Sequence, residues 1–309
     1  MNLIFVFIDG VGLGSDQPSN PFACTKTPGL NSILEGMPLY ASSTGYSGPH
    51  ASLLGLDCSL GVEGFPQSAT GQASLFTGEN AAALLGSHMN GFPDERLREL
   101  LAAKGLFRRL KESGYKASFV NAYRPEFFEM LQEGLPGNYY SCSTLITYYG
   151  GLQFKDLDCL RRGKAVYMDI TNELLYIQGY DVTMIDPETG ADNLVKLSNG
   201  FHFCMFEYFL SDLVGHSASM ADAQDEVIKL DRFIGRLYEK VNFEDTFIII
   251  TSDHGNMEDL TTKEHTLNQV PALLIGGREV RSSIETGLKD ITDLLPAIFK
   301  VLTYSDSTN

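Results

Sequence analysis

A pair of potential metal ligands stands near the C-terminal end of the chain, directly after an apolar segment. Asp253 and His254 follow the run 247–251, whose β-branched and aromatic residues are typical of a buried strand. His265 comes eleven positions after His254. Carboxylate oxygens and imidazole nitrogens suit Zn²⁺ or Mn²⁺ as ligands. The end of this strand is therefore a candidate for one part of a metal site.

The same arrangement occurs twice more in the chain. Asp9 follows the apolar run 3–8, while Asp212 and His216 follow the apolar run 201–210. Because functional side chains gather where the parallel strands of an open α/β sheet end, we expect these residues to lie together. With the residues of the first segment they provide six protein ligands. Six ligands are enough for two metal ions that each keep an open coordination position.

A serine with two possible roles precedes a run of small residues. The run 69–76 can form a helix, which places Ser68 at the N-terminal end of that helix. A serine at this position is commonly an N-cap. The N-terminus of a helix also stabilises an alkoxide or a phosphate, and Thr70 offers a second hydroxyl nearby. The local sequence leaves the role of Ser68 open.

The acidic composition limits the partners that the protein can bind. The chain of 309 residues has a formal net charge of -16 and a pI of about 4.7. Such a field repels nucleic acids and anionic membranes, so we expect neither as a partner. No apolar segment is long enough to cross a bilayer. Five cysteines at irregular spacing indicate a reducing compartment, so we expect the protein in the cytoplasm.

The remaining patterns predict an α/β protein with an insertion. Periodicity fades between residues 123 and 198, where Tyr, Gly and Pro break the chain. We therefore expect a core domain formed by 1–122 and 199–309 and an inserted cap formed by 123–198. The elements that we expect besides those above are helices within 93–113, 227–237 and 291–302, strands over 116–121, 166–170 and 271–276, and surface loops over 45–66.

Four basic residues of the expected cap are the first candidates for contacts to a substrate phosphate or carboxylate. Arginine and lysine bind such groups by charge-assisted hydrogen bonds. The four residues are Arg124, Arg161, Arg162 and Lys164.

Four short motifs follow one another in an order that identifies a family. They are IDGVG at 8–12, DLVGH at 212–216, SDHGNME at 252–258 and HTLNQVP at 265–271. With them the chain resembles the alkaline phosphatase superfamily, nearest the branch of cofactor-independent phosphoglycerate mutase and phosphopentomutase. The resemblance implies an α/β three-layer sandwich with a central, mostly parallel sheet and a small inserted cap.

The resemblance also implies a role for each candidate residue. Asp9, Asp253 and His254 correspond to the ligands of one metal ion, and Asp212, His216 and His265 correspond to the ligands of the other. Ser68 falls on the family nucleophile, which bridges to the first metal, and Gly78 falls on the glycine that closes this segment. The branch favours manganese, and ligand softness also permits zinc.

The nucleophile segment departs from the phosphoglycerate mutase pattern. It reads QSATGQ from Gln67 to Gln72 and lacks the histidine of the mutases. We expect the two glutamines to replace polar contacts to the transferred phosphoryl group. The expected cap is also shorter than the mutase cap, and no sulfatase signature is present.

We therefore predict a two-metal enzyme that hydrolyses a small phosphate ester through a phosphoserine intermediate. The alternatives are a phosphomutase acting on a sugar phosphate or a phosphoglycerate-like acid, a phosphodiesterase, and a metal-binding protein without catalysis. The substrate and the oligomeric state do not follow from the sequence.

Overall fold

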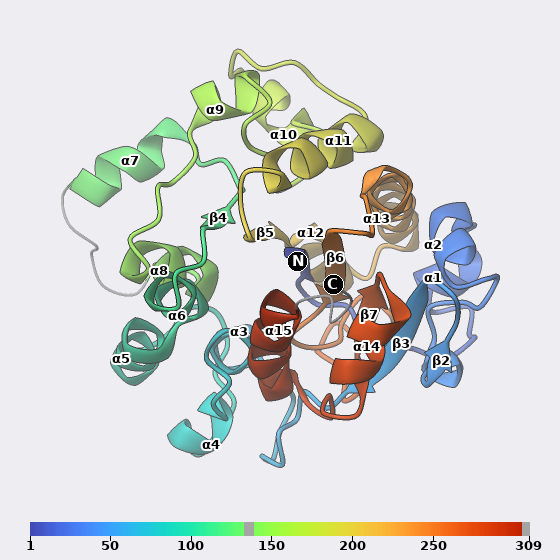
Figure 1. Cartoon of the computed structure of the whole chain (residues 1–309). Helices are drawn as coiled ribbons and strands as arrows, with labels where there is room; N and C mark the ends of the chain where they lie inside the picture. The colour runs from blue at the N-terminus through green and yellow to red at the C-terminus, as the bar shows by residue number, and fades with distance from the viewer. Residues whose placement is uncertain (133–138, 305–309) are drawn as a thin grey trace, which may run out of the picture.

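The computed structural model describes residues 1–132 and 139–304, and these ranges form an α/β fold (Figure 1). Their strands form a seven-stranded sheet in the order β2-β3-β7-β6-β1-β5-β4. The strands are β1 Asn2–Ile8, β2 Tyr46–Ser47, β3 Ala51–Leu56, β4 Ala117–Phe119, β5 Phe203–Tyr208, β6 Thr246–Thr251 and β7 Val270–Ile275. The helices are α1 Pro21–Cys24, α2 Pro28–Ile33, α3 Ser68–Thr77, α4 Ala81–Leu85, α5 Glu95–Lys104, α6 Leu106–Glu112, α7 Pro125–Gln132, α8 Cys142–Tyr149, α9 Leu157–Arg161, α10 Glu173–Ile177, α11 Pro187–Ser198, α12 Leu210–Ser217, α13 Met220–Lys240, α14 Arg278–Glu285 and α15 Leu294–Thr303, with 3-10 turns η1 Ala41–Ser43 and η2 Ile291–Asp293.

The centre of the sheet is parallel. β1 pairs in parallel with β5 and β6, and β4 pairs in parallel with β5. β7 runs antiparallel to both β6 and β3, and β2 is antiparallel to β3. Five of the seven strands described therefore point the same way, namely β1, β3, β4, β5 and β6. The predicted α/β class with a mostly parallel central sheet is confirmed.

Each face of the sheet is covered by helices because the central strands are apolar on both sides. Along β1, Phe5 and Phe7 belong to one buried cluster, whereas Ile4 and Val6 belong to the other. Residues of α3, α5, α6, α8, α14 and α15 complete the first cluster, and residues of α1, α2, α11 and α13 complete the second. Figure 1 shows α2, α11 and α13 apart from α3 and α15, with the strands between them. The result is three layers.

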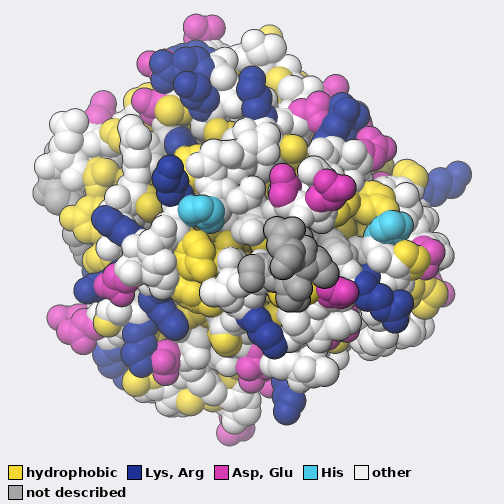
Figure 2. Space-filling model, viewed as in Figure 1, with side chains coloured by type: hydrophobic (Ala, Val, Ile, Leu, Met, Phe, Trp, Pro, Cys, Tyr) yellow, Lys and Arg dark blue, Asp and Glu magenta, His cyan; other side chains and the backbone are white. Residues whose placement is uncertain are grey.

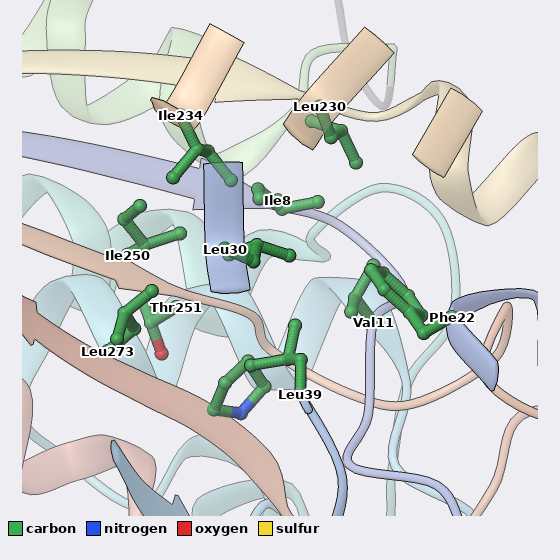
Figure 3. A pocket seen from close by; sticks show the side chains of 11 residues that line it. Ile8, Val11, Phe22, Leu30, Leu39, Leu230, Ile234, Ile250, Thr251 and Leu273 are labelled. Carbon is green, nitrogen blue, oxygen red and sulfur yellow. The ribbon is translucent and has the colours of Figure 1, made fainter. Parts of the chain in front are cut away.

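A small apolar cavity lies under the loop that follows β1 (Figure 3). Its volume is about 20 Å³, and Ile8, Val11 and Leu230 are among the side chains that line it. This space is close to that of a single water molecule, and its walls offer almost no polar partner. We interpret it as a packing gap in the core that lies beneath the loop carrying Asp9.

Two predictions of local structure are wrong. The segment 45–66, expected as loops, contains β2 and β3, because its glycines and prolines obscure the apolar run 51–56. The segment 166–170, expected as a strand, makes only a single bridge between Val166 and Asn121. The Asp169 carboxylate accepts hydrogen bonds from Asn172 N and Leu174 N at the start of α10, so the chain turns here instead of continuing as a strand.

The segment 123–198 carries α7 to α11 and divides between two environments. α8 packs against α3, α5 and α6, and α11 packs against α13. A separate small apolar cluster joins residues of α9 and α10, including Leu157, Leu160 and Leu175.

The surface shown in Figure 2 carries acidic and basic side chains interspersed with one another. Within residues 1–132 and 139–304, no helix has the length and apolar character that a membrane span requires.

Candidate metal centre

The ends of three neighbouring parallel strands bring the candidate ligands together. Asp9 follows β1 and Asp253 follows β6, and these two strands are paired. On the other side of β1, β5 leads into α12, which carries Asp212 and His216. Because these two residues are four positions apart on a helix, their side chains lie on one face. The sheet topology therefore assembles residues that are distant in sequence.

One group of side chains surrounds the imidazole of His254. Its Nε2 atom lies 3.0 Å from Ser68 Oγ, 3.2 Å from Asp9 Oδ1 and 3.6 Å from Asp253 Oδ2. His254 and Asp253 are fully buried. The four polar atoms therefore converge on one small volume below the surface.

A second group surrounds the carboxylate of Asp212. Its Oδ2 atom is 3.4 Å from His216 Nε2, and its Oδ1 atom is 3.5 Å from His265 Nε2. The two Nε2 atoms are 3.2 Å apart. The rings of His254 and His265 are stacked with centroids 3.8 Å apart, so the two groups adjoin.

The grouping differs in one respect from the one that the resemblance implies. Asp212, which the resemblance places with the second metal, also lies close to Asp9 and His254, with one ligand atom of each within 4.8 Å of the others. All seven residues predicted for the site thus lie in one continuous centre, and Asp212 stands between its two halves.

The buried carboxylates of this centre favour a bound cation. Asp9 Oδ1 and both carboxylate oxygens of Asp253 are buried and have no hydrogen-bond partner. Burial and the neighbouring Asp9 raise the pKa of Asp253 well above its usual range. Burial alone would lower the pKa of His254, but the carboxylates of Asp253 and Asp9 outweigh it and raise this pKa to about 10. Buried carboxylates without partners are costly, and a bound divalent cation would satisfy them.

In the second group, the orientation of the His216 and His265 imidazoles also favours a bound cation. The Nδ1–H of His216 donates to Lys263 O, and the Nδ1–H of His265 donates to Pro66 O, both at 2.7 Å. A carbonyl oxygen only accepts, so in the neutral rings both Nε2 atoms present lone pairs to each other and to Asp212. A backbone carbonyl that fixes the tautomer in this way is typical of metal-binding histidines. The residues present therefore fit a divalent cation in each group.

A buried glutamate that the motif analysis assigned no role organises the loops around the centre. The carboxylate of Glu258 accepts hydrogen bonds from Gly12 N at 2.8 Å, Asn256 N at 2.7 Å and Asn268 Nδ2 at 3.0 Å. Thr266 Oγ1 also donates to it. A Cβ atom on Gly12 would collide with the Glu258 carboxylate, so a larger residue at this position would displace that carboxylate. Glu258 thereby ties together three of the four sequence motifs.

Ser68 is the first residue of α3 rather than its N-cap, which is Gln67. The hydroxyl of Ser68 is therefore free of a capping role and contacts His254. Thr70 is fully buried, and its hydroxyl donates to Gln67 O and accepts from Met89 N. These bonds occupy Thr70 in the fold.

Gln72, one of the two glutamines expected to contact a phosphoryl group, holds Asp9 instead. Its Nε2–H donates to Asp9 Oδ2 at 3.0 Å. This bond leaves Asp9 Oδ1 directed at His254. Gln72 thus positions a carboxylate of the centre.

A cavity of about 620 Å³ opens beside the centre, and Asp9, Ser68 and Asp212 line it. Arg124 also lines it, whereas the side chains of Arg161, Arg162 and Lys164 are exposed and outside its lining.

Glu207, on β5, is a further lining residue that sequence reasoning did not single out. Burial raises the pKa of Glu207 to about 7, and Ser143 Oγ donates to its Oε2 at 2.6 Å. A carboxylate within an otherwise apolar strand was the signal that could have identified it.

Part of the chain matches a known family model. Residues 165–301 match the family model of the Metalloenzyme superfamily. This range includes five residues of the centre, while Asp9 and Ser68 precede it. The five residues are Asp212, His216, Asp253, His254 and His265.

Two curated relatives of this chain carry a specific enzyme name. The 2,3-bisphosphoglycerate-independent phosphoglycerate mutase of Francisella tularensis subsp. tularensis is 28% identical over 127 residues, which cover 38% of this chain and 24% of the mutase. The mutase of the same description from Cereibacter sphaeroides is 30% identical over 130 residues, which cover 38% of this chain and 25% of that protein. The chain thus spans about a quarter of the length of the curated relatives it matches.

Solved structures share the fold over the whole chain. PH0037 protein from Pyrococcus horikoshii has a TM-score of 0.59 at 15% identity and covers 100% of this chain and 98% of its own. Phosphoglycerate mutase from Leishmania mexicana, solved at low cobalt concentration, has a TM-score of 0.50 at 11% identity, with coverage of 100% and 96%. These identities show a common fold alone. Together with the family model and the mutase relatives, they confirm the resemblance to the alkaline phosphatase superfamily, nearest the phosphoglycerate mutase branch.

Proposed function

We propose that the protein is a two-metal phosphoryl-transfer enzyme that hydrolyses a small phosphate monoester through a phosphoserine intermediate. The observation that carries this proposal is the position of Ser68. Its hydroxyl stands at the N-terminus of α3, 3.0 Å from His254 Nε2, and lines the cavity beside the metal centre. A nucleophile at this point is accessible to a ligand and lies next to groups that can stabilise its anionic form.

The residues that would hold the metals follow from the two groups. Asp9, Asp253 and His254, with Ser68, would bind one ion, and the group around Asp212 would bind the other through His216 and His265. We propose Mn²⁺ or Zn²⁺, which suit carboxylate and imidazole ligands. When bound, two such ions supply Lewis-acid stabilisation of the attacking and leaving oxygens of an in-line displacement.

The protein's own residues account for the remaining chemistry. Ser68 Oγ loses its proton to solvent and attacks the phosphorus atom, a bond forms between them, and the bond from phosphorus to the alcohol oxygen breaks. The departing alcohol oxygen takes up a proton from solvent. Water then attacks the phosphorus atom of the phosphoserine, and the bond from phosphorus to Ser68 Oγ breaks. This step releases inorganic phosphate and restores the Ser68 hydroxyl. The dipole of α3 favours negative charge at Ser68 in both steps. Gln72 keeps Asp9 in place by its hydrogen bond.

We propose that residues 123–198 act as a cap on a core domain formed by 1–122 and 199–309. Support comes from the cavity, because residues of this insert, including Tyr123, Arg124 and Tyr167, line it together with Ser68 and Asp9. The five cysteines are all free thiols, which supports the proposal that the protein works in the reducing cytoplasm.

A phosphomutase is the second candidate, and the relatives named as mutases favour it. A phosphodiesterase and a metal-binding protein without catalysis are the remaining alternatives. A mutase isomerises its substrate without net release of phosphate, so the product distinguishes it from a phosphatase.

The deciding experiment measures phosphate release from a panel of monoesters and diesters in the presence of Mn²⁺, Zn²⁺ or EDTA. We expect release from monoesters that EDTA abolishes, and we expect Ser68→Ala to lower kcat by at least several orders of magnitude. Ser113→Ala, at an exposed serine that ends α6, is the matched control and should retain activity. Full metal-dependent release by Ser68→Ala, or isomerisation without release, would overturn the proposal.

A further inference from the structure

The cavity beside the metal centre has an aromatic wall. Eight of the 24 lining residues that the structure describes are Phe or Tyr, and the cavity volume is about 620 Å³. The rings of Tyr123 and Phe127 are tilted by 30° with centroids 4.1 Å apart, and the rings of Phe127 and Tyr140 meet edge to face with centroids 6.0 Å apart. The Tyr123 hydroxyl is hydrogen-bonded to Thr144 Oγ1 at 2.8 Å. These contacts fix flat apolar surfaces before any ligand arrives.

Part of the cavity lining consists of exposed apolar side chains. Phe92, Met130 and Leu213 line the cavity, and each is about half exposed to solvent, with Phe92 at 48%. Exposed apolar side chains are ordinary when they are scattered singly, but a group of them in one cavity is typical of a binding site. Water is a poor partner for these side chains, and an apolar ligand would cover them.

The charges of the cavity oppose a second anionic group on the ligand. Arg124 is the one Lys or Arg among the described lining residues, and its Nη1 already donates to Gln178 Oε1 at 3.2 Å. Glu126 and Glu207 line the same cavity outside the proposed ligand set. A carboxylate on the alcohol part of the substrate would meet these acidic side chains with a single arginine to offset them.

The amide of Asn121, which could have bound the hydroxyl groups of a sugar, is already paired. Asn121 Nδ2–H donates to Glu207 O at 2.7 Å, and Asn121 Oδ1 accepts from Glu207 N at 2.9 Å. Both hydrogen-bonding groups of this side chain therefore serve the fold. Asn121 is therefore not available to the hydroxyl groups of a polyol.

We propose that the cavity selects phosphate monoesters whose alcohol part carries an aromatic ring and no charge. This class includes aryl-methyl phosphates and nucleoside monophosphates, and the cavity is large enough for either. The proposal rests on the proposed function, because it assigns the leaving group of that reaction to this cavity. Phosphoglycerate-like acids and simple polyol phosphates are the substrates that it excludes.

The test compares esters that share a phosphate and differ in the alcohol. We would measure kcat/KM for benzyl phosphate, a nucleoside 5′-monophosphate, glycerol 3-phosphate and 3-phosphoglycerate with the metal-loaded protein. Benzyl and glycerol phosphates both release a primary alcohol, so their ratio reports the contacts of the alcohol part. We expect benzyl phosphate to exceed glycerol 3-phosphate by roughly 10- to 200-fold, the range that hydrophobic pockets reach. The nucleotide arm shows whether the selected ring is a nucleobase or a simple arene.

A variant and a binding measurement separate this proposal from the proposed function. Phe92→Ala should lower the benzyl-to-glycerol ratio by several-fold, whereas Leu84→Ala, at an exposed leucine outside the cavity, should not. Calorimetry should detect binding of benzylphosphonate, which cannot be hydrolysed, and weaker binding of phosphonoacetate. Binding of benzylphosphonate without hydrolysis of any ester would refute the proposed function and support the aromatic cavity. Equal kcat/KM values for the benzyl and glycerol esters, or a preference for 3-phosphoglycerate, would overturn the inference.

Discussion

Metal binding at the His254 position should release a proton, and its affinity should depend on pH. The neighbouring carboxylates hold the pKa of His254 at about 10 in the metal-free protein, against a usual value of 6.5. At pH 7.5 the imidazole is therefore protonated. Because a metal binds the neutral ring, the cation must displace this proton.

The size of the effect follows from this competition. Well below the pKa of His254, each unit of pH lowers the proton concentration tenfold, so the apparent affinity should rise about tenfold per unit between pH 7 and 9. The rise should level off as the pH approaches 10, where the ring is already neutral in half of the molecules. The same sign holds for folding of the metal-free protein, since a raised histidine pKa adds stability that is lost as the pH rises from 6.5 towards 10.

Calorimetric titration with Mn²⁺ measures both quantities when it is repeated in buffers of different ionisation enthalpy. A His216→Ala background weakens the second group and isolates the first. Within it, His254→Gln should lose about one released proton and the pH slope. His50→Ala, at a histidine that packs on Tyr238 away from the centre, should keep both. A binding heat that is the same in all buffers, with an affinity that is constant from pH 7 to 9, would refute the reasoning.

Two further predictions concern stability. Burial holds the pKa of Glu207 at about 7 rather than 4.5, so the metal-free protein should lose roughly 3 kcal/mol of its free energy of unfolding as the pH rises from about 4.5 to 7. Glu207→Gln should remove this loss. Urea unfolding of the unmodified protein and of the variant at pH 4.5 and 8 measures it. An equal pH dependence in the two proteins would contradict the raised pKa of Glu207. Gly78 has a φ of 72° at the end of α3, and a Cβ atom there would lie 3.3 Å from Leu295 Cδ2. Gly78→Ala should therefore lower the free energy of unfolding by more than Gly86→Ala does. Gly86 has a similar φ of 78° with open space around it, so its substitution should cost only ~1 kcal/mol. Equal losses in the two variants would show that crowding by Leu295 has no effect.

The strand-end positions of the candidate ligands could be predicted because the strands before them are apolar on both faces. A run such as 247–251 belongs in the middle of a sheet, and parallel neighbours end at the same edge. The convergence of Asp9, Asp212 and Asp253 follows from that rule and from the order of the motifs. The position of Asp212 between the two groups could not be predicted in this way, because it depends on how α12 packs after β5.

The strand β3 and the aromatic lining of the cavity could not be predicted from the sequence. β3 was missed because glycines at 45, 48 and 55 are turn signals, and only the pairing with β7 shows that the chain between them is extended. The clustered tyrosines of the insert were visible in the sequence. Which of their rings face the cavity depends on packing between α7, α8 and the core, and no local pattern encodes that packing.

The central claim is that one cation binds in each of the two groups of ligands, and anomalous diffraction tests it most directly. Crystals grown with Mn²⁺ and measured near its absorption edge should show two strong peaks. One peak should contact Asp9, Asp253 and His254, and the other should contact Asp212, His216 and His265. A single peak, no peak, or peaks away from these side chains would contradict the account.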